Sequence, residues 1–65
     1  MKITLNAETR EIQATTLDAA MRELGLTSQA LATALNGAFV SRAKRAATPL
    51  SEGDRIEVLA PMQGG

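Results

Sequence analysis

The chain opens on an alternation of apolar and polar residues. Met1, Ile3 and Leu5 alternate with polar side chains, and a period of two that includes a β-branched residue predicts a half-buried strand. Residues 6–9 are polar and predict a turn, after which the alternation resumes over 10–14. The first two elements are therefore expected to form a β-hairpin.

The next pattern has the spacing of a helix. Four apolar residues fall at the i, i+3, i+4 and i+7 positions of one helical face: Leu17, Ala20, Met21 and Leu24. Thr15 and Thr16 offer an N-cap hydroxyl, and Asp18 in the first turn favours the helix dipole. Gly25 followed by Leu26 is typical of a Schellman C-terminus, so the helix is expected to end there.

Residues 27–35 carry two conflicting signals. Their Ala and Leu content favours a helix by propensity, yet 31–35 also alternates, and Asn36-Gly37 follows directly. Asn-Gly between apolar runs is a strong hairpin signal, because a type I′ turn needs positive φ at both central residues. We therefore expect strands over 31–35 and 38–41 with the turn at Asn36-Gly37.

A basic cluster follows the second hairpin. Ser41 is expected to cap a short helical turn over 43–47, which ends before Pro49. The cluster consists of Arg42, Lys44 and Arg45. Docking on an acidic partner surface is one interpretation, but a solvated helix face is favoured because charged side chains are mostly exposed.

The last regular element is a strand. After a turn over 51–54, residues 55–59 alternate with Ile56 and Val58 expected to point inward. The order of elements, with one helix covering one face of a sheet, indicates a two-layer α+β domain. We expect this domain to span 1–60 and a flexible tail to span 61–65.

Composition excludes several classes of function. The 65 residues contain no cysteine or histidine, so disulfides, thiol nucleophiles, histidine bases and the commonest metal ligands are absent. The net charge is zero and Phe39 is the only aromatic residue, which argues against a nucleic-acid binder. No run approaches the length of a membrane span and no signal peptide is visible, so we expect a cytoplasmic protein. A chain this short also has little room for a catalytic pocket, and we expect no enzyme, metal site or bound cofactor.

The terminal Gly64-Gly65 pair offers a specific chemistry. Glycine backbone approaches other surfaces closely because it has no Cβ, and residues 61–65 in extended form reach about 15–18 Å. The α-carboxylate of Gly65 is ionised at neutral pH, and in the active site of a partner it can attack the α-phosphate of ATP to give an acyl-adenylate. Such a pair also arises by chance, so its meaning depends on the domain in front of it.

The whole pattern resembles a known family, the thiamine-biosynthesis sulfur carrier proteins. The resemblance is carried by Asn36-Gly37, by Val40 and Arg42, by the run 52–58 (Glu-Gly-Asp-Arg-Ile-Glu-Val) and by the final Gln63-Gly64-Gly65. It implies a ubiquitin-like β-grasp fold, a mixed sheet of about four to five strands with one main helix packed on one face.

The resemblance also implies a function. An E1-like adenylating enzyme would use ATP and Mg²⁺ to activate Gly65, with Gln63 and Gly64 required in the tail. Sulfur from the persulfide of a cysteine desulfurase would leave a C-terminal thiocarboxylate, and thiazole synthase would accept that sulfur. The chain itself would then be a protein co-substrate of these enzymes.

Partner choice is expected to depend on the solvent-facing side of the sheet. We predict Phe39, Leu59 and Met62 as interface residues. The alternation of side chains along the strands and closeness to the tail are the reasons for this choice. For Phe39 the alternative is a place in the core, because aromatic residues are often buried.

Three other functions remain open from the sequence. The small subunit of molybdopterin synthase is also a β-grasp sulfur carrier, although that family usually has longer chains. A protein-conjugating ubiquitin-like modifier would pass its acyl end to a lysine amine. A β-grasp interaction module with an inert tail would lose nothing when Gly64 and Gly65 are deleted.

Overall fold

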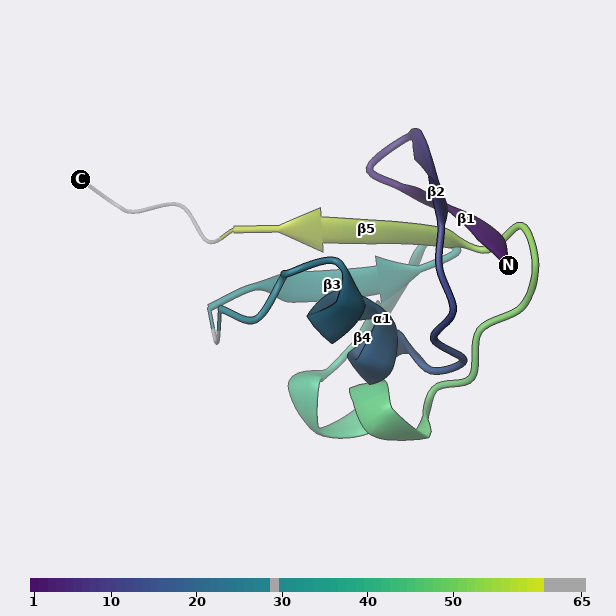
Figure 1. Cartoon of the computed structure of the whole chain (residues 1–65). Helices are drawn as coiled ribbons and strands as arrows, with labels where there is room; N and C mark the ends of the chain where they lie inside the picture. The colour runs from purple at the N-terminus through teal and green to yellow at the C-terminus, as the bar shows by residue number, and fades with distance from the viewer. Residues whose placement is uncertain (29, 61–65) are drawn as a thin grey trace.

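A computed structural model describes residues 1–28 and 30–60 of the chain. Within these residues five strands, one α-helix and one 3₁₀ helix follow one another (Figure 1). They are β1 (Lys2–Leu5), β2 (Glu8–Glu11), α1 (Leu17–Glu23), β3 (Ala32–Leu35), β4 (Ala38–Val40), η1 (Arg42–Ala47) and β5 (Arg55–Leu59). The expected order of hairpin, helix, hairpin, short connection and strand is confirmed.

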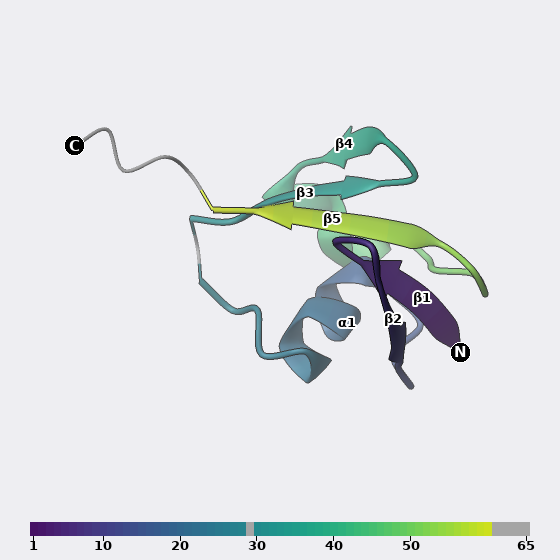
Figure 2. The same ribbon diagram turned by 90° about the horizontal axis from the view of Figure 1, so that it is seen from above.

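The five strands form one mixed sheet in the order β2-β1-β5-β3-β4. The central pair, β1 and β5, is parallel with Leu5 opposite Ile56, and the other neighbours are antiparallel. A parallel pair needs a crossover connection, and here the helix lies within it. Figure 2 shows α1 on one side of the sheet, so the two-layer α+β architecture is confirmed.

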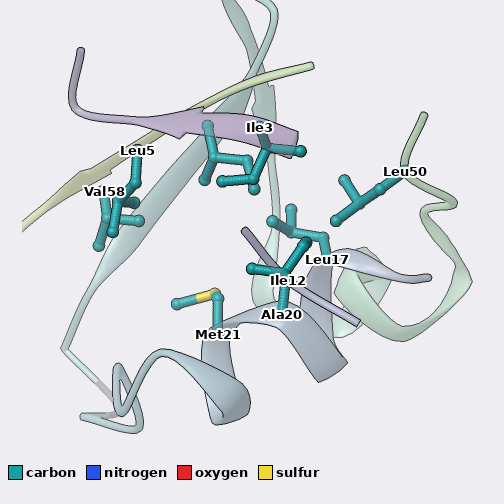
Figure 3. Close-up of a cluster of buried hydrophobic side chains, with 9 residues drawn as sticks. Ile3, Leu5, Ile12, Leu17, Ala20, Met21, Leu50 and Val58 are labelled. Carbon is teal, nitrogen blue, oxygen red and sulfur yellow. The ribbon is translucent and has the colours of Figure 1, made fainter. Parts of the chain in front are cut away.

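The core lies between α1 and the sheet (Figure 3). Alternation along β1 and β5 turns every second side chain toward the helix, as the sequence predicted. The buried apolar residues are Ile3, Leu5, Ile12, Leu17, Ala20, Met21, Leu50, Ile56 and Val58. Among residues 1–28 and 30–60, no element covers the opposite face of the sheet.

Both ends of α1 have the predicted caps. The hydroxyl of Thr16 accepts a hydrogen bond from the Ala19 amide at 3.3 Å. At the other end Gly25 has φ of +77°, and the Leu26 amide donates to the carbonyl of Met21 at 2.7 Å. This is the Schellman arrangement, and glycine fits it because the left-handed conformation is unfavourable for residues with a Cβ.

The turn of the second hairpin was predicted correctly, but the first turn spans only Asn6 and Ala7 instead of the predicted 6–9. Asn36 and Gly37 both have positive φ, as the predicted turn requires. The second strand, however, spans Glu8–Glu11 instead of the predicted 10–14. All its side chains are exposed, so it has no apolar alternation to mark it, and Ile12 enters the core just after the strand ends.

The prediction for the basic cluster was partly wrong. Arg42 and Lys44 are exposed, but Arg45 is buried, with only 6% of its surface accessible. Its Nε donates to Thr33 Oγ1 at 3.0 Å, and its Nη2 donates to the Leu31 carbonyl at 2.6 Å. Nor does the Ser41 side chain cap η1, because it makes no such hydrogen bond.

Candidate partner-binding face

The uncovered face of the sheet presents the two large exposed hydrophobic residues of the described chain. Phe39 on β4 is 73% exposed and Leu59 at the end of β5 is 68% exposed. The alternative that Phe39 belongs to the core is thereby excluded. Large apolar side chains exposed on one face are typical of a binding surface, so the geometry agrees with the predicted interface, while a role in partner binding stays a prediction.

Strand register places these two residues around a shallow hollow. Ala34 lies opposite both Phe39 and Glu57, and Ala32 lies opposite Leu59. The hollow is lined mainly by these five residues. It exists because the alanines on β3 are too short to fill the space between the larger side chains on β4 and β5. A partner side chain can therefore contact apolar surface with the Glu57 carboxylate at its edge.

A second hollow lies on the other side of Leu59. It is bounded by Thr4 on β1, by the turn at Asn6 and Ala7, and by Arg55 on β5. Leu59 and Glu57 line both hollows and together form the ridge between them. The face thus combines apolar side chains with a carboxylate and a guanidinium, a combination that can select a partner by shape and by charge.

Strand β5 connects this face to the C-terminal segment. It lies between β1 and β3, and it ends at Leu59, one residue before the exposed Ala60. The Asn6 side chain binds the backbone of Val58 from the β1 side, with the Val58 amide donating to Oδ1 at 2.9 Å. This contact was not predicted, because an asparagine in a polar turn gives no sign of a bond across the sheet.

Four of the predicted site residues lie outside the described part of the chain. These are Met62, Gln63, Gly64 and Gly65. Their predicted roles in the interface and in activation therefore remain predictions, as does the flexibility of the tail over 61–65.

Two features do not occur within residues 1–28 and 30–60. Acidic side chains in these segments do not gather in groups of three or more that suit a metal ion. No helix in the same part of the chain is long and apolar enough to cross a membrane.

Comparison with known proteins identifies the family. The model of the ThiS family matches residues 3–65, nearly the whole chain. The chain belongs to the ThiS family. No curated protein matches it.

Solved structures agree with this assignment. The crystal structure of the thiamine biosynthesis protein ThiS from Geobacter metallireducens superposes with a TM-score of 0.86 at 25% identity, and the match covers 100% of both chains. A solution NMR structure of a thiamine biosynthesis protein from the same organism gives a TM-score of 0.77 at 27% identity, covering 100% of this chain and 88% of the other. These findings confirm the β-grasp fold and the resemblance to the thiamine sulfur carriers, and they support a sulfur-carrier role.

Proposed function

We propose that this protein carries sulfur for formation of the thiazole ring in thiamine biosynthesis, as a thiocarboxylate on Gly65. The observation that carries the proposal is the ThiS family match, which runs through residue 65 and includes the Gln63-Gly64-Gly65 motif. The fold adds support, because β5 lies within the sheet and leads from the exposed face toward these residues.

The proposed chemistry begins with activation of the carboxylate. A carboxylate oxygen of Gly65 attacks the α-phosphorus of ATP in an E1-like enzyme, and pyrophosphate leaves. The terminal sulfur of a persulfide, supplied by a cysteine desulfurase, then attacks the acyl carbon and AMP leaves. A second thiol then attacks the desulfurase sulfur of the resulting acyl disulfide, which forms a new disulfide between those two sulfurs and releases the thiocarboxylate. The chain has no cysteine, so no internal thiol competes for the activated acyl group.

The partners supply the catalysis in this scheme. ATP and Mg²⁺ bind to the activating enzyme, and thiazole synthase accepts the sulfur, both in the cytoplasm. The sulfur carrier contributes recognition through the exposed face around Phe39 and Leu59 together with Met62. Because these residues lie before the reactive end, the same face can serve both partners in turn while the tail enters each active site.

Intact mass spectrometry with C-terminal fragmentation tests the proposal. The chain is incubated with ATP, Mg²⁺, the activating enzyme and a sulfur source, and one oxygen of Gly65 is expected to be replaced by sulfur. Fragmentation is essential because oxidation of Met1, Met21 or Met62 gives nearly the same mass gain. An unmodified Gly65 in the presence of the authentic partners contradicts the carrier role and favours an interaction module.

Two controls separate the steps. A chain that lacks Gly64 and Gly65 is expected to keep its thermal unfolding midpoint and to lose thiocarboxylate formation completely. The thiocarboxylate form is then offered in parallel to thiazole synthase and to the large subunit of molybdopterin synthase. Sulfur transfer to the second acceptor alone overturns the thiazole assignment while leaving the carrier role intact.

A further inference from the structure

A polar pocket lies on the helix side of the molecule, away from the exposed face of the sheet. It opens between α1, the segment after it and η1. The two helices pack against each other (Figure 1). We call it the arginine pocket, and its polar lining residues are Asp18, Arg22, Thr27, Ser28, Arg42 and Arg45. The sulfur-transfer chemistry uses none of these side chains.

The charges around the arginine pocket do not balance. Arg22 pairs with Asp18, with Nη2 and Oδ2 only 2.6 Å apart. Arg42 and Arg45 have no carboxylate within ion-pair distance among the residues that the structure describes. The pocket therefore has two guanidinium groups without a counter-charge, one exposed at its rim and one buried in its wall.

Arg45 is held so that part of its guanidinium remains available. Its Nε and Nη2 are bound to Thr33 and to the Leu31 carbonyl, which fixes the plane of the group. Nη1 donates to no acceptor among the described residues, and Arg45 is one of the residues that line the pocket. A guanidinium fixed in this way donates to an incoming oxyanion with little loss of side-chain entropy.

The remaining lining groups suit the same type of ligand. Ser28 Oγ accepts from the Ala30 amide at 3.3 Å, which leaves its hydroxyl proton free to donate. The Thr27 hydroxyl is exposed beside it. The pocket measures about 220 Å³, and a closed cavity of about 150 Å³ already admits benzene, so a phosphate group fits with space to spare.

We propose that the arginine pocket binds a phosphate group, held by Arg42 and the free edge of Arg45 with hydroxyl donors from Thr27 and Ser28. Arginine suits this role because its N–H groups match the oxygens of phosphate in pairs. The Asp18 carboxylate at the rim opposes the anion, and Arg22 offsets it in part. The site does not involve Gly65, so an experiment that contradicts the phosphate site leaves the proposed sulfur transfer untouched, and the reverse also holds.

The test uses the ¹⁵N-labelled full chain titrated with inorganic phosphate at constant ionic strength. Saturable NMR shifts are expected for the amides of Thr27 and Ser28 and for the Nε–H of Arg45. Parallel titrations with pyrophosphate and AMP identify the source of the phosphate group: tighter binding of AMP assigns a nucleotide, and equal or tighter binding of the inorganic ions assigns a free phosphate.

Three variants make the test specific, and all three change exposed or half-buried side chains. Arg42→Gln is expected to weaken phosphate binding about tenfold, the usual effect of losing a charged hydrogen bond. Lys44→Gln removes the same charge from the same helix but lies outside the pocket, so it should change the affinity less than about twofold. Asp18→Asn is expected to strengthen binding about threefold because it removes the opposing charge.

Two results contradict the phosphate site. Shifts that never saturate, or equal weakening by the Arg42 and Lys44 variants, show only general attraction to positive charge and overturn the site. Arg45 itself is left unchanged in this series, because its bonds to β3 also support the fold.

Discussion

The side chain of Asn6 binds the backbone of Val58 as a neighbouring strand would. Asn6 Oδ1 accepts from the Val58 amide at 2.9 Å, and Nδ2 donates to the Val58 carbonyl at 3.1 Å. Strand β1 pairs with β5 only at Arg55 and Ile56. The side-chain amide of Asn6 therefore continues the hydrogen bonding between β1 and β5 beyond the point where the β1 backbone turns away from β5.

Replacing Asn6 by glycine is expected to reduce the free energy of unfolding by about 1–2 kcal/mol. Glycine keeps the positive φ of +49° at this position and removes only the two side-chain bonds to Val58. Asn6→Ala should lose about 1 kcal/mol more, because alanine is strained in the left-handed region. Urea unfolding monitored by circular dichroism measures both values.

The neighbouring residue Ala7 supplies a control whose expected change in the free energy of unfolding has the opposite sign. Ala7 has φ of +70° in the same turn and makes no side-chain hydrogen bond. Ala7→Gly is expected to raise the free energy of unfolding by up to about 1 kcal/mol, since it relieves the same strain. Equal destabilisation by Asn6→Gly and Ala7→Gly would show that turn flexibility, and not the bond to Val58, is what matters.

Arg45 and Thr33 are expected to show coupled effects on stability. Arg45→Met leaves the Leu31 carbonyl without its donor, and Thr33→Val removes the acceptor of Arg45 Nε and the donor to the Val40 carbonyl. Each change should destabilise the domain by about 2 kcal/mol. The double variant should lose about 1 kcal/mol less than the sum, because the first change already breaks the shared bond. Additive losses in urea unfolding contradict this coupling.

Phe39→Asp and Leu59→Asp are expected to leave the fold intact and to weaken binding to the activating enzyme. Both side chains are largely exposed, so the free energy of unfolding should change by less than about 0.5 kcal/mol. Binding, followed by calorimetry, should weaken more than about tenfold, because a charge is placed in an apolar contact. Phe39→Leu and Leu59→Met keep apolar contact and serve as controls that should retain most of the affinity. An unfolded aspartate variant, or one that binds normally, contradicts the interface.

Gly25→Ala tests the C-terminal cap of α1. A Cβ at this position has nothing within 4 Å, so no clash arises and the effect is purely conformational. We expect a loss of about 1 kcal/mol because alanine must adopt φ near +77°. Gly25→Asn should lose less, since asparagine tolerates this conformation better. Thermal unfolding distinguishes the two variants, and equal losses for both exclude the backbone explanation.

The sequence predicted the elements whose burial is periodic. Strand β5 and helix α1 alternate apolar and polar residues with their own periods, and both caps of α1 use residue types that suit the local backbone. Strand β2 was misplaced because its four residues are all exposed and charged or polar. Its position is set by pairing with β1 across the turn at Asn6 and Ala7, and no apolar alternation within β2 marks where it begins and ends.

The burial of Arg45 is a second feature that was not predicted from the sequence. A basic residue within a charged cluster normally indicates a solvated surface, and its burial depends on acceptors that lie 12 and 14 residues earlier in the chain. One clue was present, since Thr33 places a polar side chain at an inward position of β3 where an apolar residue is usual. A buried hydroxyl needs partners, and the Thr33 hydroxyl has two: it accepts from Arg45 Nε and donates to the Val40 carbonyl.

The parallel pairing of β1 with β5 has a consequence for how the protein is made. The centre of the sheet joins residues 4 and 5 to 55 and 56, so the core is incomplete until the chain has been synthesised through β5. Pairing across such a sequence separation closes late and slows folding. A ribosome that stops before β5 therefore releases a fragment that cannot complete the sheet. Partners that recognise the folded sheet would in this way encounter only chains that have been translated through β5.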